Sequence, residues 1–108
     1  MDSNSMAYIG LAYRAGRALA GTAACEKGIK NGEVRLLLMQ RELSEGTREK
    51  FLRFCERNGT VVRLVEEPEA LGRAIGRPEI MIVGLKDRGL ANAARSMMDG
   101  VKRVGVVE

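Results

Sequence analysis

Hydrophobic and polar positions follow two different periods along this chain. Near the N-terminus, Met6, Ile9 and Tyr13 recur every three to four residues, which predicts an amphipathic helix over residues 4–15. Residues 34–40 instead form a continuous apolar run of strand length, as expected for a strand covered on both faces. The chain is therefore expected to alternate between helices and buried strands.

The same reading extends to residue 98. It predicts helices at 4–15, 23–31, 45–56, 68–75 and 88–98, and strands at 18–20, 34–40, 60–65 and 80–85. Residues suited to begin a helix precede three of these helices, and residues suited to end one follow four: N-caps Thr22, Ser44 and Asp87, and stops at Gly16, Asn31-Gly32, Asn58-Gly59 and Gly76. On the third helix, Phe51, Leu52 and Cys55 are expected to point inward.

Strands that are apolar on both faces and alternate with helices imply an α/β fold in which helices cover a central sheet on both sides. The prediction is a three-layer αβα sandwich with a four-stranded mixed sheet and about five helices. Residues 1–108 are expected to form a single domain, because this length supports one core. Residues 99–108 are interpreted either as a small edge strand or as a tail.

No apolar run is long enough to span a bilayer, and the N-terminus lacks a signal-peptide pattern, so a cytoplasmic protein without membrane contact is expected. The chain has no His, which leaves no common zinc spacing and no Cys-His or Ser-His pair. No phosphate-binding glycine motif follows a strand. No catalytic residue, metal site or cofactor is therefore predicted.

The two cysteines, Cys25 and Cys55, fall on apolar helix faces and are interpreted as packing residues. A reactive thiol at Cys25 is the alternative, since a thiolate is favoured in the first turn of a helix. An acidic cluster at Glu66, Glu67 and Glu69 precedes a helix, where negative charge is stabilising, so a structural role is favoured over metal binding or acid-base chemistry.

The net charge is +4, and its excess lies in the first and last thirds of the chain. If the fold brings these thirds together, clustered Lys and Arg would form a polyanion site. A solubilising surface is the alternative, because +4 is ordinary for a small domain.

Three segments together resemble a known family: GLAYRAGRALAG at 10–21, EKGIKNGEVRLLLM at 26–39 and LGRAIGRPEIMIVGLKDRGLA at 71–91, with the helix and strand between the last two. This order and spacing, over residues 6–98, is similar to the YlxQ-like bacterial branch of the kink-turn RNA-binding ribosomal proteins, the L-seven-Ae and L-thirty-e group. The resemblance implies an αβα sandwich that binds structured RNA without catalysis. Its expected partners are ribosomal RNA or another kink-turn RNA in a ribonucleoprotein. Ribosomal proteins are further candidate partners.

Family members resembling this chain dock the start of the second helix into the groove of a sharply bent duplex with tandem G·A pairs, and a nearby loop covers a flipped-out nucleotide. A helix start offers free amides and a positive dipole end to phosphate, and a glycine there permits close approach. The outer face of this helix should carry Ala23, Lys27, Lys30 and Asn31. The residues expected at the RNA are Gly21, Thr22, Ala23, Ala24, Lys27, Lys30, Asn31, Arg14, Arg17, Arg73, Arg77, Pro78 and Ile80. For each arginine alone, the alternative is a solvated surface group.

This chain departs from the pattern of its archaeal and eukaryotic relatives at two neighbouring positions. Archaeal and eukaryotic relatives carry an Asn and a Glu that read the G·A bases where this chain has Ala23 and Ala24. Because side-chain bonds to base edges carry discrimination, the chain is expected to keep RNA affinity but lose about 1 to 3 kcal/mol of selectivity per missing contact. The alternative is a protein-interaction module on the same fold, for which the two alanines would be harmless. A thiol-dependent enzyme is a third class.

Overall fold

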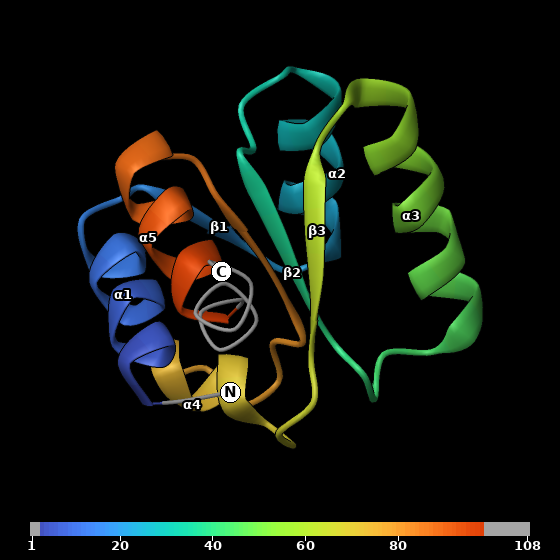
Figure 1. Cartoon of the computed structure of the whole chain (residues 1–108). Coiled ribbons are helices and arrows are strands. Elements are labelled where there is room, and N and C mark those ends of the chain that lie inside the picture. The colour runs from blue at the N-terminus through green and yellow to red at the C-terminus, as the bar shows by residue number, and fades with distance from the viewer. Residues whose placement is uncertain (1–2, 99–108) are drawn as a thin grey trace, which may run out of the picture.

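Four strands form one mixed sheet at the centre of the molecule in the computed structural model, which describes residues 3–98 (Figure 1). The strand order is β1-β4-β2-β3, with β2 parallel to β3 and the other neighbours antiparallel. The strands are β1 (Ala18–Ala20), β2 (Leu36–Gln40), β3 (Val61–Val65) and β4 (Ile82–Leu85).

Five helices cover the two faces of this sheet. They are α1 (Ser3–Arg14), α2 (Thr22–Lys30), α3 (Glu45–Asn58), α4 (Ala70–Ile75) and α5 (Arg88–Met98). Helices α2 and α3 lie on one face, and α1, α4 and α5 lie on the other (Figure 1). The predicted three-layer αβα sandwich is confirmed.

Each face of the sheet has its own apolar core, because alternate residues of a strand point to opposite sides. Leu37 and Met39 pack with α2 and α3, whereas Leu36 and Leu38 pack with the helices of the opposite layer. All five residues of β2 are buried. This explains why the strand reads as a continuous apolar run rather than as an alternating one.

Most predicted helix ends are confirmed. The hydroxyl of Ser44 accepts a bond from Thr47 N, and Asp87 Oδ1 accepts one of 2.9 Å from Leu90 N. Gly16 and Gly76 both have φ near +73°, as expected where a helix ends in a left-handed residue. The strands β2 and β4 begin two residues later than predicted, at Leu36 and Ile82.

The prediction for Leu52 is wrong, because its side chain is 42% exposed. The buried stripe of α3 consists of Phe51, Phe54 and Cys55, spaced at i, i+3 and i+4. Leu52 lies about 100° round the helix from Phe51, outside this stripe. The edge strand or tail predicted for 99–108 lies outside the described residues. Within residues 3–98, no helix combines the length and apolar character needed to cross a bilayer.

Candidate nucleic-acid interface

Helix α2 begins at a glycine rather than at the predicted Thr22. Gly21 is the N-cap, with φ +94° and ψ 162°, and its carbonyl accepts the first helical bond from Cys25 N at 3.1 Å. Thr22 is already inside the helix, so its predicted role as the cap is wrong. The reason is the backbone angle at Gly21, which L-residues rarely adopt and which turns β1 directly into α2.

Because the N-cap is a glycine, no side chain accepts hydrogen bonds from the backbone amides in the first turn of α2. A glycine has no side-chain oxygen, and no side-chain capping bond is formed. Among the described residues, the amides of Thr22, Ala23 and Ala24 donate to no acceptor. Thr22 and Ala23 are exposed, so solvent or a ligand reaches these donors. The small side chains therefore offer the backbone itself for contact.

The loop between α4 and β4 lies beside this helix start, as the resemblance implied. Gly21 N donates to Ile82 O at 3.0 Å, and a Cβ on Gly21 would be 3.6 Å from Ile80 Cδ1. Ile80 is 6% exposed, so it supports the backbone of Gly21 more than it faces solvent. Pro78, two residues earlier, is exposed.

Gly72 fixes the path of this loop over α4. A Cβ on Gly72 would lie 2.8 Å from Arg77 O and 3.0 Å from Pro78 Cα. Arg77 N in turn donates to Gly72 O at 2.9 Å. Gly72 thus serves close packing, and it holds the loop in place.

Lys27 is the cation nearest to the helix start along α2. It is exposed, and it forms no ion pair within residues 3–98. One turn separates it from Ala23, so the two share a face. With Glu26, Lys30 and Asn31 they line a shallow surface depression of about 400 Å³. The predicted outer face of α2 is confirmed, because Cys25, Gly28 and Ile29 are the buried residues.

Lys30 and Asn31 are at the opposite end of α2. Lys30 Nζ lies 2.9 Å from Glu26 Oε2 and 4.8 Å from the centre of the Phe54 ring. The ammonium of Lys30 lowers the pKa of Glu26 through a side-chain hydrogen bond. Asn31 is the C-cap, and its backbone N donates to Lys27 O at 3.0 Å.

Arg77 carries the positive charge of the loop, but Glu79 neutralises much of it. Arg77 Nε lies 3.2 Å from Glu79 Oε2, and Arg77 Nη1 donates to the hydroxyl of Tyr13 at 3.2 Å. Both ends of the ion pair are exposed. Such pairs are weak in water, so a phosphate could displace Glu79 at small cost.

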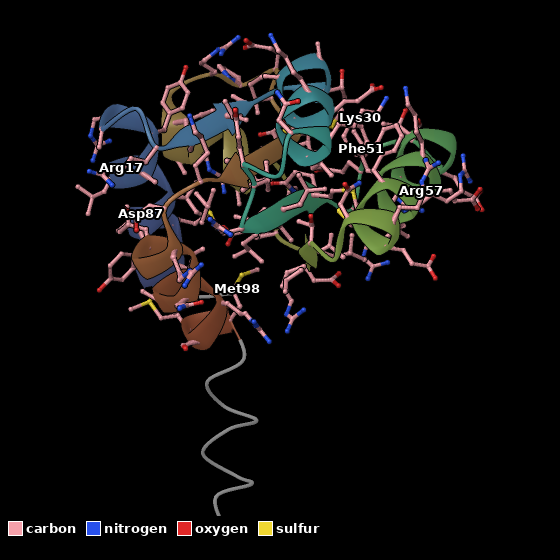
Figure 2. All side chains as sticks on the ribbon, turned by 90° about the horizontal axis from the view of Figure 1, so that it is seen from above. Arg17, Lys30, Phe51, Arg57, Asp87 and Met98 are labelled. Atoms are coloured by element: carbon pink, nitrogen blue, oxygen red, sulfur yellow. The ribbon has the colours of Figure 1, made fainter. Side chains whose placement is uncertain are left out.

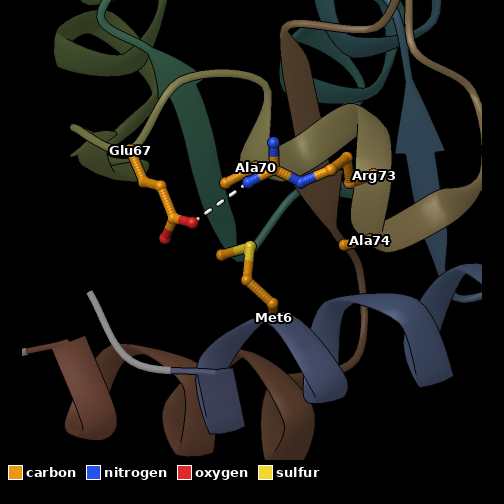
Figure 3. A pocket seen from close by; sticks show the side chains of 5 residues that line it. All are labelled: Met6, Glu67, Ala70, Arg73 and Ala74. Carbon is orange, nitrogen blue, oxygen red and sulfur yellow. Dashed lines mark hydrogen bonds and ion pairs between the residues drawn. The ribbon is translucent and has the colours of Figure 1, made fainter.

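Arg73 points away from the helix start. Its guanidinium lies 3.0 Å from Glu67 and 3.8 Å from Glu69. Arg73 and Glu67 line a surface depression together with Met6 and Ala70 (Figure 3). These contacts, with the pair between Glu66 and Arg41, give the acidic cluster structural partners.

Arg17 lies on the other side of the molecule from Lys30 (Figure 2). Its Nη1 is 2.6 Å from Asp87 Oδ2, at the end of β1 remote from Gly21. Arg14 is exposed on the last turn of α1, with Nη1 over Gly10 of its own helix. The 76–80 loop therefore lies beside the start of α2, whereas Arg14, Arg17 and Arg73 do not.

The two thiols are buried on the inner side of α2 and α3. Burial raises the pKa of Cys25 to about 12 and that of Cys55 to about 11. Cys25 Sγ donates to Leu19 O at 3.6 Å. A neutral buried thiol is a poor nucleophile, so the reactive-thiol alternative finds no support here.

Sequence reasoning missed two residues that shape the site. Gln40 was assigned only to a strand, but its buried side chain accepts from Leu71 N and donates to Glu67 O, which anchors α4. Tyr13 was assigned to the core, but its hydroxyl accepts from Arg77. A polar residue ending an apolar strand was the only available signal for Gln40.

The fold and the site define a class of small αβα-sandwich domains. On one surface, these domains present a helix start that has no side-chain cap, next to a neighbouring loop. No protein-family model matches the chain. The RNA-binding protein YlxQ of Bacillus subtilis (strain 168) is 32% identical over 91 residues, which cover 84% of this chain and 91% of the relative. The chain belongs to the YlxQ family, as the sequence resemblance indicated.

Two solved structures superpose on the chain. A protein of unknown function from Bacillus halodurans C superposes with a TM-score of 0.85 at 31% identity, over 91% of this chain and 99% of that one. The 15.5kD RNA-binding protein of Giardia lamblia superposes with a TM-score of 0.73 at 14% identity, over 94% of this chain and 91% of that one. The second likeness shows the fold alone.

Proposed function

We propose that this protein binds structured RNA, without catalysing a reaction, through the start of α2 and the adjacent 76–80 loop. The observation that carries the proposal is the set of three amides, at Thr22, Ala23 and Ala24, that have no acceptor within residues 3–98, on a turn where Thr22 and Ala23 are exposed. Unpaired amides at the positive end of a helix favour phosphate. The name of the relative from Bacillus subtilis, an RNA-binding protein, agrees with this partner.

Each part of the surface has a separate role in the proposal. Gly21 lets the RNA backbone approach closely, the three amides hold a phosphate, and Lys27 adds a charge on the same face. The exposed Pro78 covers an unstacked base, with Ile80 packed beneath Gly21. The more peripheral contacts would come from Lys30, Asn31 and Arg77, whereas Arg14, Arg17 and Arg73 lie away from the start of α2 and have no part in the proposal.

The preferred RNA is a kink-turn-like element, with ribosomal RNA as the first candidate and other ribonucleoproteins as the next. Ala23 is exposed and Ala24 half-buried, and neither offers a hydrogen bond to a base edge. Amides and lysines fix register and affinity, whereas base contacts provide discrimination. We therefore expect the protein to bind bent or folded RNA with reduced preference for tandem G·A pairs.

The test is the salt dependence of binding to a labelled kink-turn RNA. Lys27→Ala should weaken binding to different structured RNAs alike and reduce the slope of log K against log salt by about 1. Arg88→Gln, an exposed cation on the opposite helical layer, is the matched control and should bind as the wild type does. Absence of binding to any structured RNA at low ionic strength would reject the proposal.

A protein-interaction module is the second candidate. A shallow groove of about 350 Å³ is lined by Ala7, Tyr8, Leu11 and Met97, and the Leu11 side chain is 50% exposed. This apolar groove lies between α1 and α5, away from the start of α2. Binding of a protein partner there, with no RNA binding, would favour this candidate.

A further inference from the structure

Three cations from two helices converge on one aromatic ring. Lys30 of α2 and Lys50 and Arg57 of α3 lie 4.8, 5.7 and 5.6 Å from the centre of the Phe54 ring. We call Lys30, Lys50 and Arg57 the α2–α3 cation cluster. Phe54 itself is buried and forms an edge-to-face contact with Phe51, so the ring is held rigidly beneath the three charges.

The cluster carries more positive charge than its surroundings neutralise. Glu26 lies 2.9 Å from Lys30 and 3.4 Å from Lys50, and it is the carboxylate that pairs with both. Arg57 has no carboxylate partner within residues 3–98. The charges are separated by about one Debye length or less at 0.1 M salt, so their repulsion is only partly screened.

The cluster is continuous with the start of α2. The depression along α2 runs from Ala23 in the first turn, past Lys27, to Lys30 and Asn31. From Thr22 to Lys30 the helix rises about 12 Å, a length over which one nucleic-acid strand presents several phosphates. Lys27 lies between the two ends and is free of ion pairs among the described residues.

We propose that the α2–α3 cation cluster is a second phosphate-binding surface, which holds the backbone of the RNA where it continues beyond the start of α2. This inference rests on the proposed function and extends it from one docking point to a track across two helices. Figure 2 shows Lys30 and Arg57 on the side of the molecule opposite to Arg17 and Asp87. RNA is favoured over an acidic protein because the depression leads directly to the free amides.

The test compares a minimal kink-turn hairpin with two longer versions, in each of which one helical arm is extended by about eight base pairs. The wild type should bind one extended RNA more tightly than the minimal RNA. The double variant Lys50→Gln, Arg57→Gln should lose this gain, roughly tenfold, and lower the salt slope for that RNA by about 1 to 2. Its affinity for the minimal RNA should be unchanged.

Two further variants separate binding from folding. Glu26→Gln removes the carboxylate that neutralises Lys30 and Lys50, so it should strengthen binding of the extended RNA. If the cluster only stabilises the fold, the same variant should lower the stability of the protein and leave RNA binding no stronger. Arg88→Gln should bind both RNAs normally. Thermal unfolding of each variant shows whether it is folded.

The outcomes distinguish this inference from the proposed function. Equal wild-type affinity for minimal and extended RNAs, or a double variant that retains the gain, would overturn the second surface and leave the first site standing. Loss of binding to the minimal RNA in the double variant would also overturn it. If no RNA binds, and the cluster instead binds an acidic protein, both proposals are wrong.

Discussion

The side chain of Gln40 caps helix α4 through Leu71. Gln40 Oε1 accepts a bond of 2.7 Å from Leu71 N, while Gln40 Nε2 donates to Glu67 O at 2.9 Å. The side chain of Glu69, the N-cap residue of α4, makes no capping hydrogen bond. Gln40 N also donates to Met81 O at 2.8 Å. One buried residue of β2 thus holds both ends of the segment that carries the 76–80 loop.

Gln40→Leu should therefore destabilise the protein by about 2 to 3 kcal/mol, because it leaves the buried amide of Leu71 without an acceptor and also removes the bond to Glu67 O. Urea unfolding measures this change. Ser44→Ala is the matched control, since it removes a helix cap on the surface, where water replaces the bond, and it should cost about 1 kcal/mol. Equal losses in the two variants would show that Gln40 is not the anchor of α4.

Gly72→Ala should disturb the loop without touching a ligand. The new methyl group would lie 2.8 Å from Arg77 O, a backbone atom that must move. We expect a loss of about 1 to 3 kcal/mol in the free energy of unfolding, together with weaker RNA binding. In contrast, Gly46→Ala on α3 meets no atom within 4 Å and should stabilise the helix by about 0.5 to 1 kcal/mol. A neutral Gly72→Ala would contradict the tight packing of loop on helix.

The thiols should be unreactive until the protein unfolds. With the pKa of Cys25 raised to about 12 and that of Cys55 to about 11, both are protonated near neutral pH. Alkylation by iodoacetamide at pH 8 should be slow in buffer and should rise with the unfolded fraction in urea. Because the folded pKa values lie above the ordinary value of 9.0, the thiols also favour the folded state up to about pH 9, and this contribution is lost as the pH rises towards 11 and 12. Fast alkylation in buffer would reopen the thiol-enzyme class.

Ala23→Asn should increase discrimination rather than overall affinity. The position is exposed on the first turn of α2, where an amide side chain can reach a base edge. We expect preference for a kink-turn RNA over its G·A-disrupted version to grow by about 1 to 3 kcal/mol, or roughly 5- to 150-fold. Competition binding with the two RNAs measures this ratio. An unchanged ratio would mean that this turn does not face the bases.

Periodicity predicted the layers of the fold because each helix and strand faces one core on each side of the sheet. The pattern at Leu36 to Gln40 was sufficient to identify a central strand. It was insufficient at Thr22, where a threonine of good capping propensity follows a glycine whose φ of +94° starts the helix one residue earlier. A backbone angle outside the ordinary range cannot be inferred from side-chain propensities.

The site was only partly predictable for a related reason. Gly21, Lys27 and the 76–80 loop were expected together and do lie on connected parts of one surface. The partner of Arg17, however, is Asp87, seventy positions away, and no local pattern reveals such a pair. Ion pairs across the fold decide which cations remain free for a ligand.

The most direct test of the central claim is an amide chemical-shift titration of the ¹⁵N-labelled protein with a kink-turn RNA. Phosphate bound at the start of α2 should shift the amides of Thr22, Ala23 and Ala24 most strongly, with smaller changes at Lys27 and the 76–80 loop and none at Arg88. RNA binding that leaves the three amides unmoved would contradict the account.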